Sequence, residues 1–280
     1  MEFTLTNSQS RVIELLQNNN YKAYVVGGAV RDYFLGKKQK DIDLATQCLP
    51  DDISNLLTEE FTVIPDTVAF YHGIVRIVDK DTGEIIDIAT CRKDVSCNGR
   101  HAEVVFTQHI SEDLARRDLT INAMAAEIDP NGQCKELIDP FNGQDDIKHR
   151  RIIFVGDPDI RIKEDHLRMI RACRFTALGD KWTITQEEYI KQNANEILTV
   201  SKERIRDEIL KALSYDRPSN FFRALDATNL LIHVFPDLTL GIGCTQNEYH
   251  ATAVYRCKRC DTQISFAELG KLRAKNTSHC

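Results

Sequence analysis

Two closely spaced motifs near the start of the chain combine glycines with carboxylates. A short apolar run ends at Val26, Gly-Gly-Ala-Val-Arg-Asp follows from Gly27 to Asp32, and Asp-Ile-Asp occupies positions 41–43. A glycine pair between a strand and a helix lets backbone N–H groups face a phosphate. Two carboxylates close to such a turn can bind a divalent metal. The combination suggests nucleotidyl transfer.

The alternation of a β-strand gives the carboxylates a common face. If residues 41–44 form a strand, Asp41 and Asp43 lie on one face, and Ile42 and Leu44 lie on the other, toward a core. Mg²⁺ prefers one or two carboxylates, completed by waters and substrate phosphates, and a pair of such ions stabilises both oxygens of an in-line displacement. Asp87, in the pattern Ile86-Asp87-Ile88, is the best third carboxylate. An isolated Asp-x-Asp is more often a turn, and the neighbouring glycine pair makes the metal site the preferred interpretation.

The elements that would position these residues change character along the chain. Up to about residue 138, short β-like runs alternate with helical ones, and from Asp145 onward the apolar spacing is helical. Strands are predicted at residues 23–26, 42–45, 74–78, 85–89, 103–106 and 123–128. Helices are predicted around residues 167–175 and 205–213, with a start near Ser201 and a break at Pro218. The first half is therefore expected to be α/β and the second all-α.

Composition is typical of a soluble globular protein. The 280 residues are 42% hydrophobic and 28% charged, which allows two or three domains. No apolar run has the length of a membrane span and the N-terminus lacks a signal-peptide layout, so a cytoplasmic protein without membrane contact is expected. The net charge of −6 argues against a uniformly basic nucleic-acid binder but allows a local basic patch. The nine cysteines have no regular spacing, and Cys91, Cys134 and Cys173 are predicted to be buried thiols.

Five motifs occur in the order seen in one enzyme family. They are GGAVRDYFLG, KDIDLAT, RRDLTINAMA from Arg116, EDHLRMIRACRF from Glu164 and SKERIRDEILKAL from Ser201. The chain resembles, over roughly residues 20–215, the class II nucleotidyltransferases, which include the tRNA CCA-adding enzymes and bacterial poly(A) polymerases. The resemblance implies an α+β fold, with a polymerase-β-like head over residues 1–140 and a helical neck over 141–216. Residues 217–280 would form a partial helical body with a divergent or truncated tail.

The motif at Glu164 predicts how a base would be selected. Asp165 and Arg168 are three apart and would share one face of a helix, where the simpler interpretation is a surface ion pair. An ionised Asp only accepts hydrogen bonds and an Arg only donates them, which complements the amine and ring nitrogen of cytosine and adenine but not uracil or guanine. In the family the matching pair has this role. Glu164 and Arg171 would orient it, and Arg174 is assigned with them to nucleotide binding.

The remaining predicted contacts surround the triphosphate and ribose. Arg116 and Arg117 carry guanidinium forks that suit triphosphate oxygens, and Asp118 or Asn122 could bond the ribose hydroxyls. The alternative is that Asp118 caps a helix and the arginines are solvated. Gly27, Gly28 and Arg31 are also expected to contact phosphates. Asp32 could instead pair internally with an arginine.

The resemblance implies a CCA-adding enzyme that uses Mg²⁺, CTP and ATP to extend the 3′ end of tRNA and releases pyrophosphate. Asp41, Asp43 and Asp87 would be its catalytic residues, with Asp41 and Asp43 holding the metal. The polar, turn-rich residues 92–103 resemble the flexible loop of the family and argue against a CC-adding member. A poly(A) polymerase or A-adding enzyme remains an alternative, as does a non-catalytic RNA-binding protein; a small-molecule nucleotidyltransferase would not need the motif at Glu164. A zinc site at Cys257 and Cys260 is disfavoured by irregular ligand spacing, and the oligomeric state is left open.

Overall fold

The computed structural model describes residues 1–39, 42–98 and 101–240. They form two compact units, of which the first holds residues 1–168 and 183–186. Among the described residues, the second holds 169–182 and 187–240. The predicted domain boundaries at residues 140 and 216 remain predictions, and the predicted α+β fold is confirmed.

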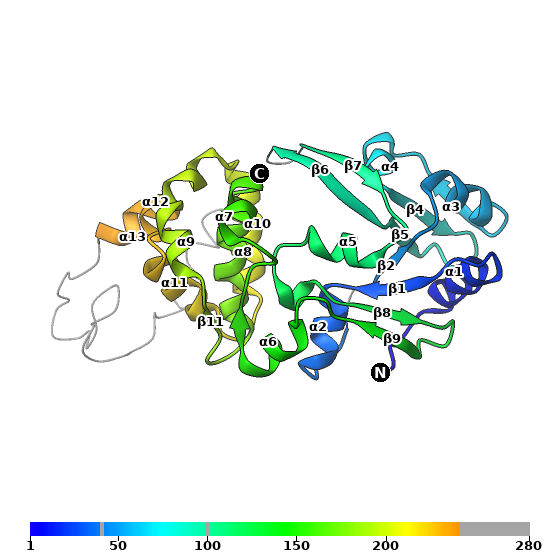
Figure 1. Cartoon of the computed structure of the whole chain (residues 1–280), viewed down its shortest axis with the longest axis horizontal. Coiled ribbons are helices and arrows are strands. Elements are labelled where there is room, and N and C mark those ends of the chain that lie inside the picture. Colours follow the sequence, from blue (N-terminus) through cyan, green and yellow to red (C-terminus); the bar gives the residue numbers. More distant parts are fainter. Residues whose placement is uncertain (40–41, 99–100, 241–280) are drawn as a thin grey trace. The chain divides into compact units, whose positions relative to one another are not determined.

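The first unit is built on a seven-stranded mixed sheet (Figure 1) in the order β3-β4-β5-β2-β1-β8-β9. Strand β2 runs parallel to β5, whereas the other neighbouring strands of the sheet are antiparallel. All four residues of β1 are buried, which matches their apolar character and central position. The strands are β1 (Ala23–Val26), β2 (Asp43–Thr46), β3 (Phe61–Ile64), β4 (Ile74–Asp79), β5 (Ile85–Thr90), β8 (Ala125–Ile128) and β9 (Cys134–Ile138).

Helices and two small ribbons complete the first unit. Helix α1 begins with a capping box, in which Thr6 and Gln9 bond each other's backbone N–H groups, and it contacts both α3 and β1. The helices are α1 (Asn7–Asn18), α2 (Gly28–Phe34), α3 (Pro50–Leu57), α4 (Thr67–Tyr71), α5 (Ile110–Ala115), the 3-10 turn η1 (Thr120–Asn122), α6 (Gly143–His149) and α7 (Pro158–Glu164). The ribbons pair β6 (Arg92–Asn98) with β7 (His101–Phe106), and β10 (Arg151–Ile152) with β11 (Thr183–Ile184).

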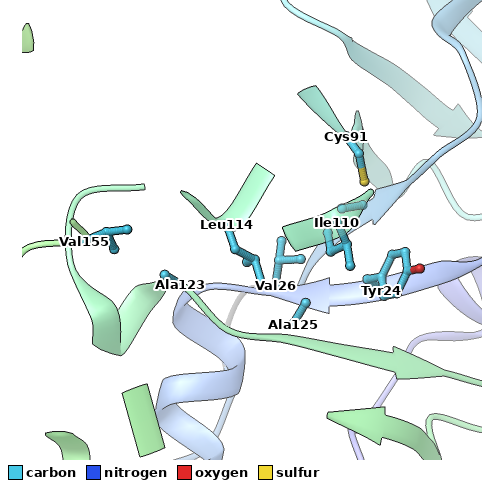
Figure 2. Packing of buried hydrophobic residues seen from close by; sticks show 9 residues of the cluster. Tyr24, Val26, Cys91, Ile110, Leu114, Ala123, Ala125 and Val155 are labelled. Atoms are coloured by element: carbon cyan, nitrogen blue, oxygen red, sulfur yellow. The ribbon is translucent and has the colours of Figure 1, made fainter. Parts of the chain in front are cut away.

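A buried apolar cluster fixes α5 on one face of this sheet. Ile110 and Leu114 of α5 pack with Tyr24 and Val26 of β1 (Figure 2). Cys91 lies in the same cluster, and its burial raises the pKa of the thiol to about 12. Removing a large apolar side chain from water contributes about 1.5–3 kcal/mol, so these contacts hold the end of α5 in place.

The second unit is helical. Its elements after α8 (Leu167–Phe175), which begins in the first unit, are η2 (Thr176–Leu178), α9 (Glu187–Gln192), η3 (Ala194–Thr199), α10 (Lys202–Leu213), α11 (Pro218–Ala227), α12 (Leu231–Val234) and α13 (Pro236–Leu240). Ser201 is the N-cap of α10, which is the helix start predicted there. The chain breaks between α10 and α11 before Pro218, as predicted, and Pro218 is the first residue of α11. Among the described residues, no helix is long and apolar enough to cross a bilayer.

Three structural expectations were wrong. Residues 92–98 and 101–106 pair as a hairpin, although the segment 92–103 was predicted to be a polar, turn-rich loop. The second half is not all-α, because β10 and β11 form a two-stranded sheet. Cys134 is only half-buried, since it lies on the edge strand β9, whereas Cys91 and Cys173 are buried as expected.

Candidate nucleotide and metal site

Three segments of the first unit meet where β1 ends. Val26, the last residue of β1, pairs with Asp43 on one side and with Ala125 on the other. The N–H of Gly27 donates to the carbonyl of Met124, 3.1 Å away. The sheet register therefore brings the glycine turn, the first residue of β2 and the end of the Arg-Arg-Asp motif to one edge.

Gly27 has the backbone conformation and the close neighbour that require glycine. Its φ of +68° lies in the left-handed region, and a Cβ there would lie 2.7 Å from Nη1 of Arg117. At Gly28, a Cβ would meet Nη2 of Arg31 at 3.6 Å, an ordinary contact. The two glycines are thus not equivalent: the chain turns at Gly27, and α2 begins at Gly28.

The structure describes Asp43 and Asp87, whereas Asp41 lies outside the described residues. Leu44 pairs with Ile88 on parallel strands, so Asp43 and Asp87, each one position earlier, share a face of neighbouring strands about 4.8 Å apart. Both side chains are exposed, and carboxylate oxygens suit a hard divalent cation. Within the described part, no three acidic, Cys or His side chains cluster as a metal site. The metal assignment stays a prediction.

Asp87 is bound by an arginine that the sequence analysis did not consider. Arg76, opposite Asp87 on β4, donates from Nε and Nη2 to the two carboxylate oxygens, both at 2.7 Å. About half of each side chain is exposed, 47% for Arg76 and 43% for Asp87. A cation that recruits Asp87 must compete with this guanidinium.

Arg31, Asp118 and Asn122 form a buried network. Nη1 of Arg31 donates to Oδ1 of Asn122 at 2.8 Å, and Nδ2 of Asn122 donates to Oδ1 of Asp118 at 3.3 Å. Arg31 also pairs with Asp32 at 2.7 Å, the internal pairing considered for that aspartate. Asp118 accepts the N–H of Leu119 at 2.8 Å, beside the start of η1. The phosphate and ribose contacts predicted for these residues remain predictions.

A buried carboxylate, Asp113, anchors both arginines of the Arg-Arg-Asp motif. Its Oδ1 accepts from Nε and Nη2 of Arg116 at 3.0 and 2.8 Å, and its Oδ2 accepts from Nη2 of Arg117 at 3.1 Å. The side chain of Asp113 is 3% exposed. Burial opposes its ionisation, but the charges and hydrogen bonds of the two arginines outweigh burial and hold the pKa of Asp113 below its usual value.

The motif at Glu164 does not form one continuous helix. Helix α7 ends at Glu164, Asp165 is extended with φ −154° and ψ 105°, and α8 begins at Leu167. The expectation that Asp165 and Arg168 share a helical face was wrong, because Asp165 is extended and lies between the two helices, whereas Arg168 lies in α8. Oδ1 of Asp165 accepts the N–H of Leu167 at 3.2 Å, and its carbonyl accepts the N–H of Arg168 at 3.0 Å.

Arg168 is held by Glu164 and by the end of α5. Its Nη1 donates to Oε2 of Glu164 at 2.5 Å, and its Nη2 donates to the carbonyl of Arg116 at 3.2 Å. Arg161, another residue not singled out from the sequence, pairs with Glu164 at 3.1 Å. The carbonyls at a helix end have no intrahelical partner, so an arginine is a suitable donor there. A continuous path of contacts thus joins Gly27 to Arg168 through Arg117, Asp113 and Arg116.

Arg171 and Arg174 belong to the second unit. Nε of Arg174 lies 2.6 Å from Oε2 of the buried Glu208 of α10, and Nη1 of Arg171 lies 3.7 Å from Oε1. Nη1 of Arg174 also donates to the hydroxyl of Tyr215 at 2.6 Å. These contacts join α8 to α10, and the predicted nucleotide contacts of both arginines are not tested by them. Cys257 and Cys260 lie outside the described residues.

Comparisons with known families agree with this geometry. Residues 23–153 match the model described as the poly(A) polymerase head domain, which covers the edge where β1, β2 and β8 meet. Residues 185–240 match the model described as a probable RNA- and SrmB-binding site of polymerase A. The second match covers the helices that follow the Glu164 motif.

Several individual relatives are named CCA-adding enzymes. A CCA-adding enzyme of Levilactobacillus brevis is 38% identical over 223 residues, which is 78% of this chain and 53% of the relative. The solved Bacillus stearothermophilus CCA-adding enzyme in complex with CTP matches with a TM-score of 0.67 and 35% identity, over 81% of this chain and 53% of that one. A Thermotoga maritima CCA-adding enzyme complexed with tRNA matches with a TM-score of 0.66 and 28% identity, over 83% and 52%. The chain spans about half the length of the curated relatives it matches.

Proposed function

Because this chain belongs to the nucleotidyltransferase family that contains the poly(A) polymerase head domain, we propose that it is a CCA-adding enzyme. It transfers CMP and AMP from CTP and ATP to the 3′ end of tRNA and releases pyrophosphate. The proposal includes Mg²⁺ as its metal and the cytoplasm as its location. Relatives solved with CTP and with tRNA support the choice of substrates.

The observation that carries the proposal is the continuous path of contacts from the glycine turn to Arg168. It joins the Gly27 turn to Arg168 within one compact unit, which supports a phosphate-binding end and a base-reading end in one site. Binding of a nucleotide requires both a phosphate-binding end and a base-reading end of the site, because the triphosphate and the base are recognised by different side chains. A protein that only binds RNA needs neither.

Different residues of the chain are assigned to the metal and to the triphosphate. Asp43, with Asp41 and Asp87, would hold the metal. When bound, the metal would neutralise phosphate charge and favour attack by the 3′ hydroxyl oxygen of the tRNA. Arg116 contacts the triphosphate, and Arg117 supports the Gly27 turn. Catalysis then depends on positioning and electrostatic stabilisation rather than on a covalent intermediate.

Base selection follows from hydrogen-bond chemistry at Asp165 and Arg168. Glu164 fixes the Arg168 guanidinium through the 2.5 Å contact, so that side chain does not have to be ordered when a base arrives. A uracil or guanine presents the reversed donor and acceptor, and each buried group left unpaired costs about 1–3 kcal/mol. Cytosine and adenine are therefore accepted, and uracil and guanine are rejected.

The test is incorporation into a tRNA that lacks its terminal CCA, with CTP and ATP supplied separately and together. We expect two residues with CTP alone and three with both. A long A tract with ATP alone would instead identify a poly(A) polymerase, and tRNA binding without incorporation would identify a non-catalytic RNA-binding protein. Asp43→Asn should abolish incorporation with the thermal unfolding midpoint preserved; normal turnover in this variant would refute the metal assignment.

A further inference from the structure

Arg116 and Arg117 are adjacent in sequence and share one buried carboxylate, yet their remaining contacts differ. Nη1 of Arg117 donates to the carbonyl of Asn122 at 3.4 Å and lies against Gly27, where a Cβ would be 2.7 Å away. Both terminal nitrogens of Arg117 are thus committed to protein groups. Its Nε is buried and has no hydrogen-bond partner among the residues the structure describes.

Arg116 keeps one terminal nitrogen for a ligand. Its Nε and Nη2 both donate to Oδ1 of Asp113, while Nη1 makes no hydrogen bond within the described chain. The side chain as a whole is 23% exposed. A guanidinium fixed through one edge and open at the other suits a phosphate oxygen.

Without a shared anion, two neighbouring guanidinium groups would repel each other and turn toward water. Asp113 lies three and four residues before them, the spacing at which helical side chains meet. Its carboxylate also accepts the backbone N–H of Arg92 at 3.3 Å, which fixes the carboxylate against β6. Oδ1 of Asp113 thus accepts from the backbone of β6 as well as from Arg116, and the backbone contact does not depend on either arginine side chain of the motif.

We propose that Asp113 is a positioning residue that gives the two arginines separate tasks. It holds Arg117 as a strut against the Gly27 turn, and it presents Nη1 of Arg116 to the triphosphate. This inference rests on the proposed function for the identity of the ligand. It assigns a role to a residue outside the five motifs that indicated the family.

The inference separates affinity for the triphosphate from selection of the base. The triphosphate is common to all four nucleotides, whereas Arg168 is fixed by the side chain of Glu164 and by the backbone carbonyl of Arg116, neither of which involves the Asp113 carboxylate. Loss of the Asp113 charge should therefore weaken binding of every triphosphate by the same factor. A collapsed site would also lose discrimination between CTP and UTP.

The experiment titrates the full chain with CTP, ATP and inorganic tripolyphosphate by calorimetry and measures the CTP to UTP incorporation ratio. Asp113→Asn should weaken all three ligands by about tenfold and leave the ratio within about twofold, because one charge-assisted anchor is lost. The control is Glu112→Gln on the same helix, whose carboxylate bonds Thr107 and lies 3.7 Å from Lys93; it should bind normally. Unchanged tripolyphosphate affinity in Asp113→Asn, or loss of the ratio, overturns the inference.

Two further variants test the division of tasks even if Asp113→Asn does not fold. Arg116→Gln should lose tripolyphosphate affinity with little change in thermal midpoint, whereas Arg117→Gln should mainly lower the midpoint. Equal effects in both variants would overturn the inference. If the unmodified chain binds triphosphates and shows these differences but does not extend tRNA, the proposed function fails and the role of Asp113 stands. If it extends tRNA but shows no such differences, only the inference fails.

Discussion

Single residues of the site are fixed by contacts that are close in space but distant in sequence. Gly27 faces Arg117, Asp87 is bound by Arg76, and the carbonyl of Arg116 accepts from Arg168. Each contact constrains what can be substituted at that position. At this scale, predictions concern the space and the charge at one side chain.

Gly27→Ala should destabilise the protein, because alanine there adopts a positive φ and meets Arg117 at 2.7 Å. We expect the free energy of unfolding to fall by about 1–3 kcal/mol, the usual cost of such strain. Gly28→Ala is the matched control, since its Cβ finds ordinary contacts and a helical position. Urea unfolding measures both, and an equal effect of the two substitutions would contradict the assignment of the turn to Gly27.

Arg76→Thr should strengthen binding of a divalent cation, because it removes the guanidinium that competes for both oxygens of Asp87. An exposed ion pair is worth about 0.2–1 kcal/mol, so affinity should rise by at most about fivefold. Mn²⁺ titration followed by electron paramagnetic resonance measures this without turnover. Lys80→Thr is the control for net charge, since Lys80 bonds backbone carbonyls of Thr58 and Glu59. Equal affinity in the Arg76 and Lys80 variants would remove Asp87 from the metal site.

At the scale of elements, the boundary between α7 and α8 determines where the two residues proposed to read the base lie. Asp165 occupies an extended position between the helices, and its side chain bonds the N–H of Leu167 at 3.2 Å. Helical spacing placed Asp165 and Arg168 on one helical face, but the break brings Arg168 to Glu164 and to the end of α5 instead.

Substitutions of Asp165 should separate its hydrogen bond to the start of α8 from its proposed base-reading role. Asparagine caps a helix about as well as aspartate, so Asp165→Asn should change the free energy of unfolding by less than about 0.5 kcal/mol. It adds an amide donor beside the acceptor, and the CTP to UTP incorporation ratio should fall. Asp165→Ala should lose the ratio and also about 1 kcal/mol of stability. An unchanged ratio in Asp165→Asn would show that Asp165 does not face the base.

At the scale of the whole molecule, stability in acid depends on carboxylates that hold turns and arginines. Asp79 ends β4, and its 2% exposed side chain accepts the N–H groups of Asp81 and Thr82 at 2.8 and 2.9 Å. Hydrogen bonds from the Thr82 backbone, from Ser8 and from the Asp81 backbone lower the pKa of Asp79 to about 2.

The free energy of unfolding should therefore decrease as the pH falls from about 4 to about 2. The unfolded chain takes up a proton near pH 3.9 while folded Asp79 stays ionised, so its contribution is complete above that pH and is lost below it. Asp79→Asn should remove this part of the pH dependence, and Asp81→Asn, 83% exposed, should not. Urea unfolding at pH 5, 4 and 3 measures the slopes. Parallel slopes for the original chain and Asp79→Asn would contradict the assignment.

The sequence by itself determined the family, the order of the motifs and most strands that position them. Strand β1 was predicted with its observed bounds, and the apolar residues of α8 were predicted to be helical, because apolar periodicity is a local signal. The edge strands β3 and β9 and strand β6 were not predicted, whereas residues 103–106 of β7 were. The short or polar runs of the unpredicted strands resemble loops, and they are strands because they pair with neighbours.

Only the tertiary structure decided which charges are paired. Asp113 stood at helical spacing before Arg116 and Arg117, a signal that was available but overlooked, whereas no spacing connects Arg76 to Asp87 or Arg168 to the carbonyl of Arg116. These pairs form across strands and between helices, where the distance along the chain says nothing about the distance in space. The residue type determines which interactions a side chain can make, but packing of the apolar core beneath it determines which partner lies within reach.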